Sequence, residues 1–348
     1  MFATNCTNRA GKPVNTWVSR MKSGSQSAPK LAVAPMMEWT DRHCRQLHRR
    51  FSPHAHLYTE MVTTGAILHG PRDRLLAFGA AEQPLALQLG GCDPDALAEC
   101  SAIAEQAGFS EVNLNVGCPS DRVQNARIGA CLMAEPELVK RCTQAMRKAT
   151  SLPVTVKCRL GIDQHDNAEF LFRFIDTVAA SGVSEFSLHA RIAVLKGLSP
   201  AQNRSVPPLN YERAGLAKAQ FPELRFLLNG GINRADQAQQ LLELTGCDGA
   251  MIGRAAYQNP WLLAELDARW FNTPMPAHRL DPVRDYLTYV EQELAAGTKL
   301  HSITRHMLGI ASALPGARAF RRFLSEHANK PGADLHTLTQ ALELIRSC

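Results

Sequence analysis

The chain contains, at residues 111–120, the stretch Glu111-Val112-Asn113-Leu114-Asn115-Val116-Gly117-Cys118-Pro119-Ser120. Its first six residues form a strand-like run, and the next four form a turn that presents one thiol. The glycine before the cysteine and the proline after it make this turn sharp and stiff. A cysteine held directly after a strand is placed for chemistry more than for packing. Its role depends on what the other strands carry at their ends.

The same order of short β-rich run, loop and helical run repeats from residue 31 onward. Strands are expected at residues 31–36, 56–62, 85–90, 111–116, 154–160, 185–190, 226–229 and 250–253. Helical stretches lie between most of them, for example at 94–108, 136–150, 167–182 and 235–246. Eight strands with helical crossovers over ~240 residues are typical of a (β/α)8 TIM barrel. The rival, a doubly wound α/β sheet, would carry Gly-x-Gly-x-x-Gly after its first strand, and this chain does not.

Composition divides the chain into three parts. Residues 1–30 contain five Lys or Arg and no acid, and they lack an apolar period. This composition predicts a disordered basic extension, which has no role, contacts RNA or, as a weaker third option, is a transit peptide. The barrel is expected to occupy residues 31–275 and to close with a helix at 261–271. A Pro-rich linker leads to residues 281–348, where helices expected at 282–296, 302–313, 317–329 and 335–346 predict an all-α bundle.

Composition also excludes several classes of protein. No apolar run approaches the ~18 residues that a membrane span needs. The ten cysteines are scattered, without a Cys-x-x-Cys pair or zinc-site spacing, so neither a metal site nor a disulfide framework is expected. We therefore expect a cytoplasmic protein with mostly reduced, buried cysteines. A monomer is expected as well. The stretch from Lys299 to Lys330 holds six Lys or Arg against one acid, a patch that attracts a polyanion.

In a TIM barrel the active site forms at the carboxyl ends of the strands. The expected ends carry Pro35-Met36-Met37, Gln88, Asn115 to Cys118, Lys157-Cys158-Arg159, His189-Ala190-Arg191, Asn229-Gly230-Gly231 and Gly253-Arg254. A lone histidine on a strand is more often structural, but a strand interior seldom contains an unpaired amine such as that of Lys157.

The glycines after the last two strands favour a phosphate site over simple tight turns, because both loops occur together and Arg254 adds a cation. A phosphate site together with a lysine inside the barrel favours flavin mononucleotide (FMN). Lys157 would stabilise the reduced anionic ring, and the amide of Gln88 would pair with its polar edge. Met36 and Met37 provide either an apolar shelf for the ring or part of the core.

Several segments carry a resemblance to a known family. They are residues 34–42, 58–66, 87–91, 113–124, 156–157, 189–191, 229–231, 256–260, 303–309 and 315–318. On these segments the chain resembles the tRNA-dihydrouridine synthases, and most closely their A-type subfamily. The resemblance covers residues 30 to 340. The chain departs from the family pattern at Glu38, Cys158, Ile192 and Val194.

The resemblance implies a flavin barrel followed by a helical tRNA-binding domain. It implies reduction of the C5=C6 bond of uridine at positions 20 and 20a of the tRNA D-loop, with hydride from reduced FMN to C6, a proton from Cys118 to C5, and NADPH as the reductant. The FMN-binding residues that it implies are Pro35, Met36, Met37, Gln88, Lys157, His189, Asn229, Gly230, Gly231, Gly253 and Arg254. The tRNA contacts that it implies are Asn115, Arg204, Arg318 and Arg321.

The role of an acid suits a cysteine, because an ordinary thiol with a pKa of about 8.5 is protonated at neutral pH. A nucleophilic thiolate would need a histidine in the same loop, and none is there.

One arc of the expected helix 317–329 carries Arg318, Arg321 and Arg322, and the opposite arc carries Phe320, Phe323 and Leu324. Such a stripe is usually a solvated charged face, but the scarcity of acids nearby favours phosphate contact.

Two other functions fit parts of the pattern. One is a flavin barrel that acts on a free pyrimidine, as dihydroorotate dehydrogenases do in reverse. The other is a non-catalytic RNA-binding module. The basic helical region argues against the first, and Lys157, Cys118 and the glycine loops argue against the second.

Overall fold

The computed structural model describes residues 28–120 and 127–345. Residues 1–27 of the predicted basic extension lie outside the described residues, and Lys30 already begins the first strand. The strands are β1 (Lys30–Val33), β2 (Leu57–Tyr58), β3 (Val62–Thr63), β4 (Leu85–Gly90), β5 (Glu111–Val116), β6 (Val154–Arg159), β7 (Glu185–His189), β8 (Arg225–Asn229) and β9 (Gly249–Ile252).

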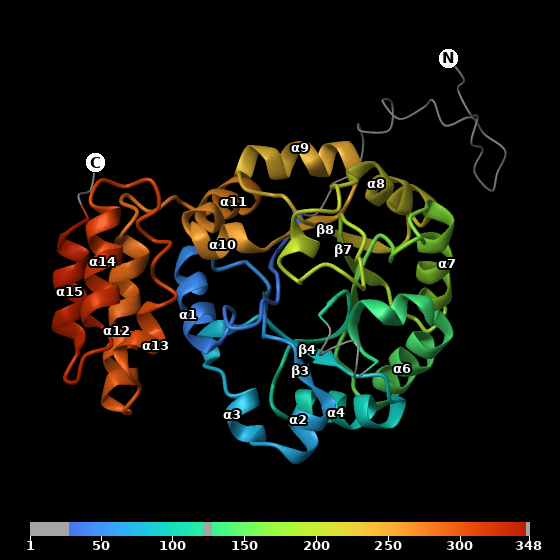
Figure 1. Ribbon diagram of the computed structural model, residues 1–348, viewed down its shortest axis with the longest axis horizontal. Coiled ribbons are helices and arrows are strands. Elements are labelled where there is room, and N and C mark those ends of the chain that lie inside the picture. Colours follow the sequence, from blue (N-terminus) through green and yellow to red (C-terminus); the bar gives the residue numbers. More distant parts are fainter. Residues whose placement is uncertain (1–27, 121–126, 346–348) are drawn as a thin grey trace.

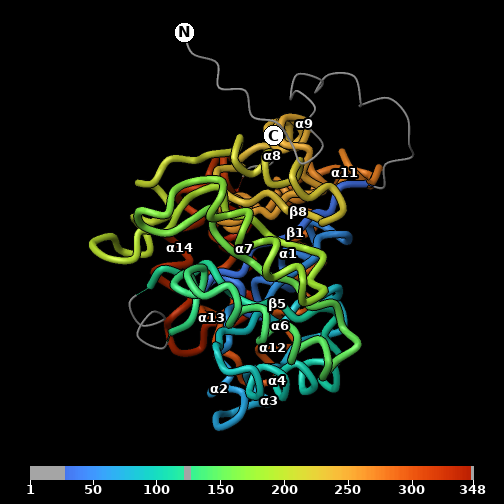
Figure 2. Tube along the Cα trace, turned by 90° about the vertical axis from the view of Figure 1, so that its right-hand side faces the viewer, coloured from blue at the N-terminus to red at the C-terminus, as the bar shows by residue number. Residues whose placement is uncertain are grey.

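All strand pairs are parallel, in the order β1-β9-β8-β7-β6-β5-β4-β2, with β3 also beside β4. The sheet closes where Ala32 bridges His56, and the N–H of Val33 donates to the carbonyl of His56 at 3.0 Å. The helices form a ring around the strands, with α8 and α9 on the opposite side of the barrel from α2, α3 and α4 (Figure 1, Figure 2). The predicted (β/α)8 TIM barrel is confirmed.

The helices of the barrel are α1 (Arg42–Phe51), α2 (Thr64–His69), α3 (Arg72–Leu76), α4 (Pro94–Gln106), α6 (Pro136–Ala149), α7 (Ala168–Ala179), α8 (Tyr211–Gln220), α9 (Ala235–Thr245), α10 (Arg254–Gln258) and α11 (Trp261–Phe271). Short 3-10 helices lie at Ala80–Glu82, Gly129–Ala134 and Gln202–Arg204. Polar side chains begin several of these helices by accepting free N–H groups, for example Asp93 before α4 and Asn167 before α7.

The remaining helices are α12 (Asp281–Ala295), α13 (Leu300–Thr304), α14 (Ala317–His327) and α15 (Leu335–Glu343). They form a group on one side of the barrel, next to α1 (Figure 1). Tyr286 of α12 donates to the carbonyl of His43 in α1 at 3.0 Å. None of the helices within residues 28–120 and 127–345 is long and apolar enough to cross a membrane.

Two expected elements were wrong in detail. The second strand is split into β2 and β3 by a bulge. Between the pairs Tyr58–Ala86 and Val62–Leu89, this segment has one more residue than the facing segment of β4. Across this bulge the hydroxyl of Thr59 accepts the N–H of Gln88 at 3.0 Å, in place of a ladder bond.

The helix expected at 302–313 ends at Thr304, and tight turns follow to residue 316. The reason is a close tertiary approach at Gly309, where a Cβ would lie 2.3 Å from the carbonyl oxygen of Tyr257. The turns also bury Met307, Ile310 and Ala311.

Side-chain alternation along β5 separates an apolar layer from a polar one. Val112, Leu114 and Val116 belong to the main apolar core. The side chains of Glu111, Asn113 and Asn115 bond to neighbouring strands instead. The barrel interior beneath the strand ends is therefore polar, which bears directly on the site.

Candidate functional site

The register of the parallel strands gathers the predicted residues around one rim. Asn115 pairs with Lys157, Arg159 with His189, and His189 with Asn229. Residues paired in this way are neighbours across the sheet, so their side chains lie on the same face, here the barrel interior near the carboxyl ends of the strands. Four consecutive strands thus deliver amide, amine, guanidinium and imidazole groups to one place.

The turn that carries Cys118 is held on both sides. The side-chain oxygen of Asn115 accepts the backbone N–H groups of Gly117 and Cys118, each at 3.0 Å. The Nε of Arg159 donates to the carbonyl of Gly117 at 3.1 Å. The thiol is half-buried, and its Sγ lies 3.6 Å from the hydroxyl of Ser120. Among the described residues no histidine is bonded to this thiol, which suits an acid better than a nucleophile.

Arg159 stands at an expected strand end, but the sequence analysis assigned it no role in the site. It is 3% exposed, and it donates to the carbonyls of Gly117, Ile192 and Asn203. Burial lowers the pKa of its guanidinium to about 10. The available signal was its spacing: it lies two residues after Lys157 on a strand, so both side chains face the interior.

The rim carries a cluster of cations around His189. Burial lowers the pKa of Lys157 to about 8, and the nearby Arg159 lowers it further. Burial also holds the pKa of His189 well below its usual value, helped by Arg159, Lys157, Arg191 and Arg254. The imidazole is therefore neutral at neutral pH, and the positive charge of the site comes from the lysine and the arginines.

Several features of this cluster fit an anionic ligand. Among the described residues no acceptor is bonded to the Lys157 amine, and the Nε of Arg191 is buried without a partner. Gly230 and Gly231 have φ of 109° and 72°. A Cβ on Gly230 would lie 2.7 Å from the His189 ring, and one on Gly231 would lie 2.5 Å from the Tyr211 hydroxyl. The residues present fit a phosphate-bearing flavin.

The other predicted cofactor residues lie around the same rim. Met36 is half-buried against the core, whereas Met37 is 58% exposed. The amide of Asn229 donates to the carbonyl of Met251 at 2.7 Å and so ties together the ends of β8 and β9. The remaining residues are half-buried Pro35, buried Gln88, half-buried Gly253 just before α10, and exposed Arg254 as its first residue.

The four predicted RNA contacts lie in three different places. Asn115 is 8% exposed and is bonded inside the barrel. Arg204 is exposed at the mouth, and Arg254 donates to its carbonyl at 3.3 Å. Arg318 and Arg321 are exposed on α14, away from the strand ends. The structure therefore brings only Asn115 and Arg204 close to Cys118.

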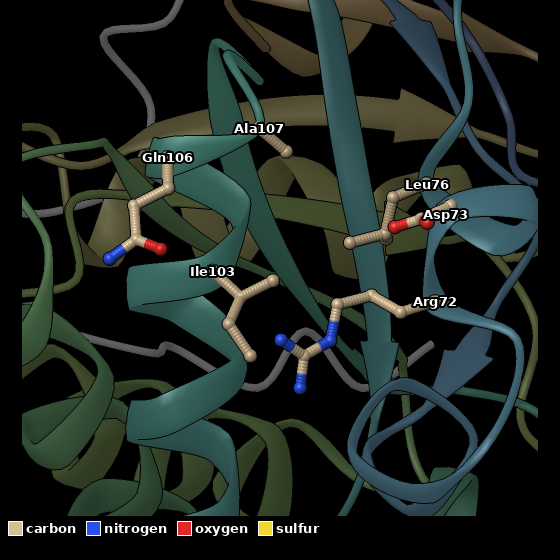
Figure 3. A pocket seen from close by; sticks show the side chains of 6 residues that line it. All are labelled: Arg72, Asp73, Leu76, Ile103, Gln106 and Ala107. Carbon is tan, nitrogen blue, oxygen red and sulfur yellow. The ribbon is translucent and has the colours of Figure 1, made fainter.

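An open hollow on the outside of the barrel lies elsewhere. It is formed by α3 and the end of α4 and is lined by Arg72, Asp73, Leu76, Ile103, Gln106 and Ala107 (Figure 3). The chain passes from the end of α4 into the start of β5, so this hollow lies at the amino ends of the strands. It is not part of the site. Within the described residues, no group of three His, Cys, Asp or Glu could hold a metal ion.

The model of one protein family, "Dihydrouridine synthase (Dus)", matches residues 32–346. The chain belongs to the dihydrouridine synthase family. It is 54% identical to the tRNA-dihydrouridine(20/20a) synthase of Vibrio cholerae over 318 residues, which is 91% of this chain and 96% of that protein. It is 52% identical to the protein of the same name from Escherichia coli K12, over 91% of both chains.

Among solved structures, morphinone reductase is similar in fold to this family member. The TM-score is 0.51 at 12% sequence identity, over 72% of this chain and 92% of that one. At this identity the likeness shows the fold alone. It agrees with the strand order of the sheet.

Proposed function

We propose that this chain reduces the C5=C6 bond of uridine to 5,6-dihydrouridine in the D-loop of tRNA, at positions 20 and 20a. The cofactor is FMN, and NADPH is the reductant. The protein works as a cytoplasmic monomer. One observation carries the proposal: a half-buried thiol lies beside buried cations for which the described residues provide no acidic partner, at the carboxyl ends of the strands of a dihydrouridine synthase barrel.

The cofactor is held by the residues of the rim. Gly230, Gly231, Gly253 and Arg254 bind the phosphate. Lys157 would stabilise the reduced, anionic form of the ring. The other contacts to the ring and its ribityl chain come from Pro35, Met36, Met37, Gln88, His189 and Asn229. When bound, the flavin supplies the hydride that C6 of the uracil ring accepts.

Cys118 supplies the proton to C5. The backbone of its turn is held by Asn115 and Arg159, so the segment that carries the thiol is positioned without help from a substrate. After the transfer a thiolate remains, and the buried guanidinium of Arg159 stabilises it. Neutral His189 is a hydrogen-bonding group in this step rather than a second acid, because its pKa is held low by burial and by the cations.

The target uridine has to leave its stack to reach the mouth of the barrel. Arg204 lies at that mouth, and Asn115 lies just beneath it. Arg318 and Arg321 on α14 bind phosphates of the surrounding RNA. Contact over two separate elements favours folded tRNA over free uridine as the substrate.

The decisive variant is Cys118→Ala. We expect it to bind FMN and accept electrons from NADPH at the wild-type rate. We expect it to form dihydrouridine in tRNA at least about 100-fold more slowly, because general acid catalysis typically contributes a factor of this size. Dihydrouridine is measured by mass spectrometry of digested tRNA.

Cys247→Ala serves as the matched control, because Cys247 is buried just before β9, at the opposite end of the barrel. Free uridine replaces tRNA in a parallel assay. Full tRNA turnover by Cys118→Ala would remove the cysteine from the reaction. Faster turnover of free uridine than of tRNA would instead favour an enzyme of free pyrimidines.

A further inference from the structure

A continuous chain of side-chain hydrogen bonds runs through the barrel interior to the thiol turn. At its lower end Thr155 donates to the carboxylate of Glu111 at 2.6 Å, and the amide of Asn113 donates to Thr155 at 2.8 Å. Gln88 donates to Asn113 at 2.7 Å, and Asn115 donates to Gln88 at 2.8 Å. All five residues are buried. The upper end is the pair of bonds from Asn115 to the backbone of the Cys118 turn.

Glu111, at the lower end of this chain of hydrogen bonds, can act only as an acceptor. Lys30 lies 3.1 Å and His56 3.3 Å from one carboxylate oxygen of Glu111, and Tyr58 donates to the other at 2.8 Å. The Lys30 ammonium and the Tyr58 hydroxyl favour the ionised form of Glu111, and its pKa is lowered. Its neighbour Thr155 must therefore donate to it, which leaves the hydroxyl oxygen free to accept from Asn113.

The upper end imposes the same direction. The N–H groups of Gly117 and Cys118 are donors, so the Asn115 side chain must turn its oxygen toward them and its amide N–H groups toward Gln88. Gln88 and Asn113 then have one orientation that satisfies both neighbours. If either amide were reversed, two buried donors would face each other.

We propose that Thr155 and Asn113 are positioning residues for Cys118. They act through Gln88 and Asn115 and fix the side-chain oxygen of Asn115 toward the backbone of the thiol turn. A carboxylate at the amino end of the barrel thus sets the orientation of an acid at its carboxyl end. This inference rests on the proposed function of Cys118.

The variant Thr155→Val tests the chain of hydrogen bonds, because valine has nearly the same shape as threonine. Valine cannot donate to Glu111 or accept from Asn113, so the hydrogen-bond connection between Glu111 and the upper side chains is broken. We expect the step in which tRNA reoxidises the reduced flavin to slow about 10-fold or more, because small misplacements of a catalytic group have effects of this size. We expect NADPH to reduce the flavin within about twofold of the wild-type rate, because Cys118 takes no part in that step.

A second readout follows the turn itself. Alkylation of Cys118 by iodoacetamide, at one pH and without tRNA, is measured by peptide mass spectrometry. We expect the rate to rise about threefold or more in Thr155→Val, because the turn loses its fixed support. Thr155→Ser retains the hydroxyl and should restore both rates.

Thr143→Val is the matched control for a lost buried hydroxyl. Thr143 is fully buried on α6 and is bonded to Ser181 at 2.8 Å, outside the barrel interior. The thermal unfolding temperature of Thr143→Val should shift as much as that of Thr155→Val. Its rate of flavin reoxidation by tRNA and its rate of Cys118 alkylation should stay at the wild-type values.

If Thr155→Val does not fold, Asn113→Asp replaces it, because aspartate has the same shape and cannot donate to Thr155.

The proposal stands if tRNA-dependent reoxidation slows and alkylation of Cys118 accelerates together, relative to Thr143→Val. The proposal is overturned if either the reoxidation rate or the alkylation rate of Thr155→Val equals that of Thr143→Val. It is also overturned if reduction by NADPH and reoxidation by tRNA both slow in proportion to a loss of bound flavin. A wild-type protein whose reduced flavin is not reoxidised by tRNA would contradict the proposed function instead. The alkylation rates of the Thr155 and Thr143 variants would still decide whether the chain positions the turn.

Discussion

Lys157 has opposite effects on folding and on cofactor binding. Its amine is buried among cations, and its pKa falls from 10.5 to about 8 because of burial and then of Arg159. The folded chain therefore holds this proton less tightly than the unfolded chain does. Below pH 8 the charged amine destabilises the fold, and this penalty disappears as the pH rises from 8 to 10.5. A bound anion offsets the same penalty.

Replacement of Lys157 by Met should therefore stabilise the flavin-free protein. We expect a gain of up to about 3 kcal/mol in the free energy of unfolding at pH 7, shrinking to nothing near pH 10.5. Denaturant unfolding at several pH values measures this. Lys148→Met, on the exposed end of α6, is the control. Identical pH dependence in the wild type and Lys157→Met would contradict the account.

Much of the candidate site could be predicted from residues at strand ends, because a parallel barrel brings all these ends to one rim. Cross-strand partners could not be predicted in this way. The alternation along 111–116 is visible in the sequence, but the bonds of Asn113 to Thr155 and Gln88 depend on the register of three strands. The role of Arg159 was missed for the same reason, since its three acceptors are backbone carbonyls of distant loops and no sequence motif encodes them.

At the scale of elements, α14 has the two faces that its sequence predicted. Phe320 and Leu324 are buried, while Arg318, Arg321 and Arg322 are exposed. A row of guanidinium groups above an apolar seam suits contact with phosphates, whose strength depends on salt. Their contact with tRNA stays a prediction.

The double variant Arg318→Ala and Arg321→Ala should weaken tRNA binding and leave the flavin content unchanged. Each lost phosphate contact lowers the slope of log affinity against log salt by about 0.7–0.9, so we expect a decrease of about 1.5 for the pair. Filter binding at several salt concentrations measures the slope. Arg284→Ala on α12 is the control, because Arg284 is exposed and paired with Asp281. An unchanged slope in the double variant would show that α14 does not contact the RNA.

Most elements matched their predicted positions within a few residues, since buried parallel strands and capped helices have strong local patterns. β4 and β5 match at both ends. The failures occurred where a tertiary contact overrides the local pattern. The bulge between β2 and β3 depends on Thr59 and β4, and the end of α13 depends on the approach of Gly309 to α10.

At the scale of the whole molecule, one carboxylate joins the barrel to the C-terminal helices. Asp41 lies 3.3 Å from Arg305 and 2.9 Å from His306, which is fully buried. Burial raises the pKa of Asp41, but the bonds from His306 and the N–H of Cys44 outweigh this effect and lower it below 3.8. The contribution of the Asp41 carboxylate to stability is therefore present above pH 3.8 and is lost as the pH falls below that value.

The variant Asp41→Asn should loosen the contact between these two parts. We expect a loss of about 1.5–3 kcal/mol in the free energy of unfolding, the usual value of a hydrogen bond to a charged group. We also expect faster proteolysis within residues 273–280, the segment between α11 and α12. Asp236→Asn, which breaks a surface pair with Arg234, is the control. If both variants are cleaved equally slowly, Asp41 does not hold the two parts together.

In the proposed reaction this member of the dihydrouridine synthase family reduces uridine in tRNA, and Cys118 donates the proton. The most direct test is a single turnover without oxygen, in which protein with fully reduced flavin is mixed with excess tRNA lacking modifications. For the wild type, the account predicts one dihydrouridine for each flavin reoxidised. For Cys118→Ala, it predicts that the flavin stays reduced over the same time. Flavin reoxidation without dihydrouridine, or equal product from both proteins, would contradict it.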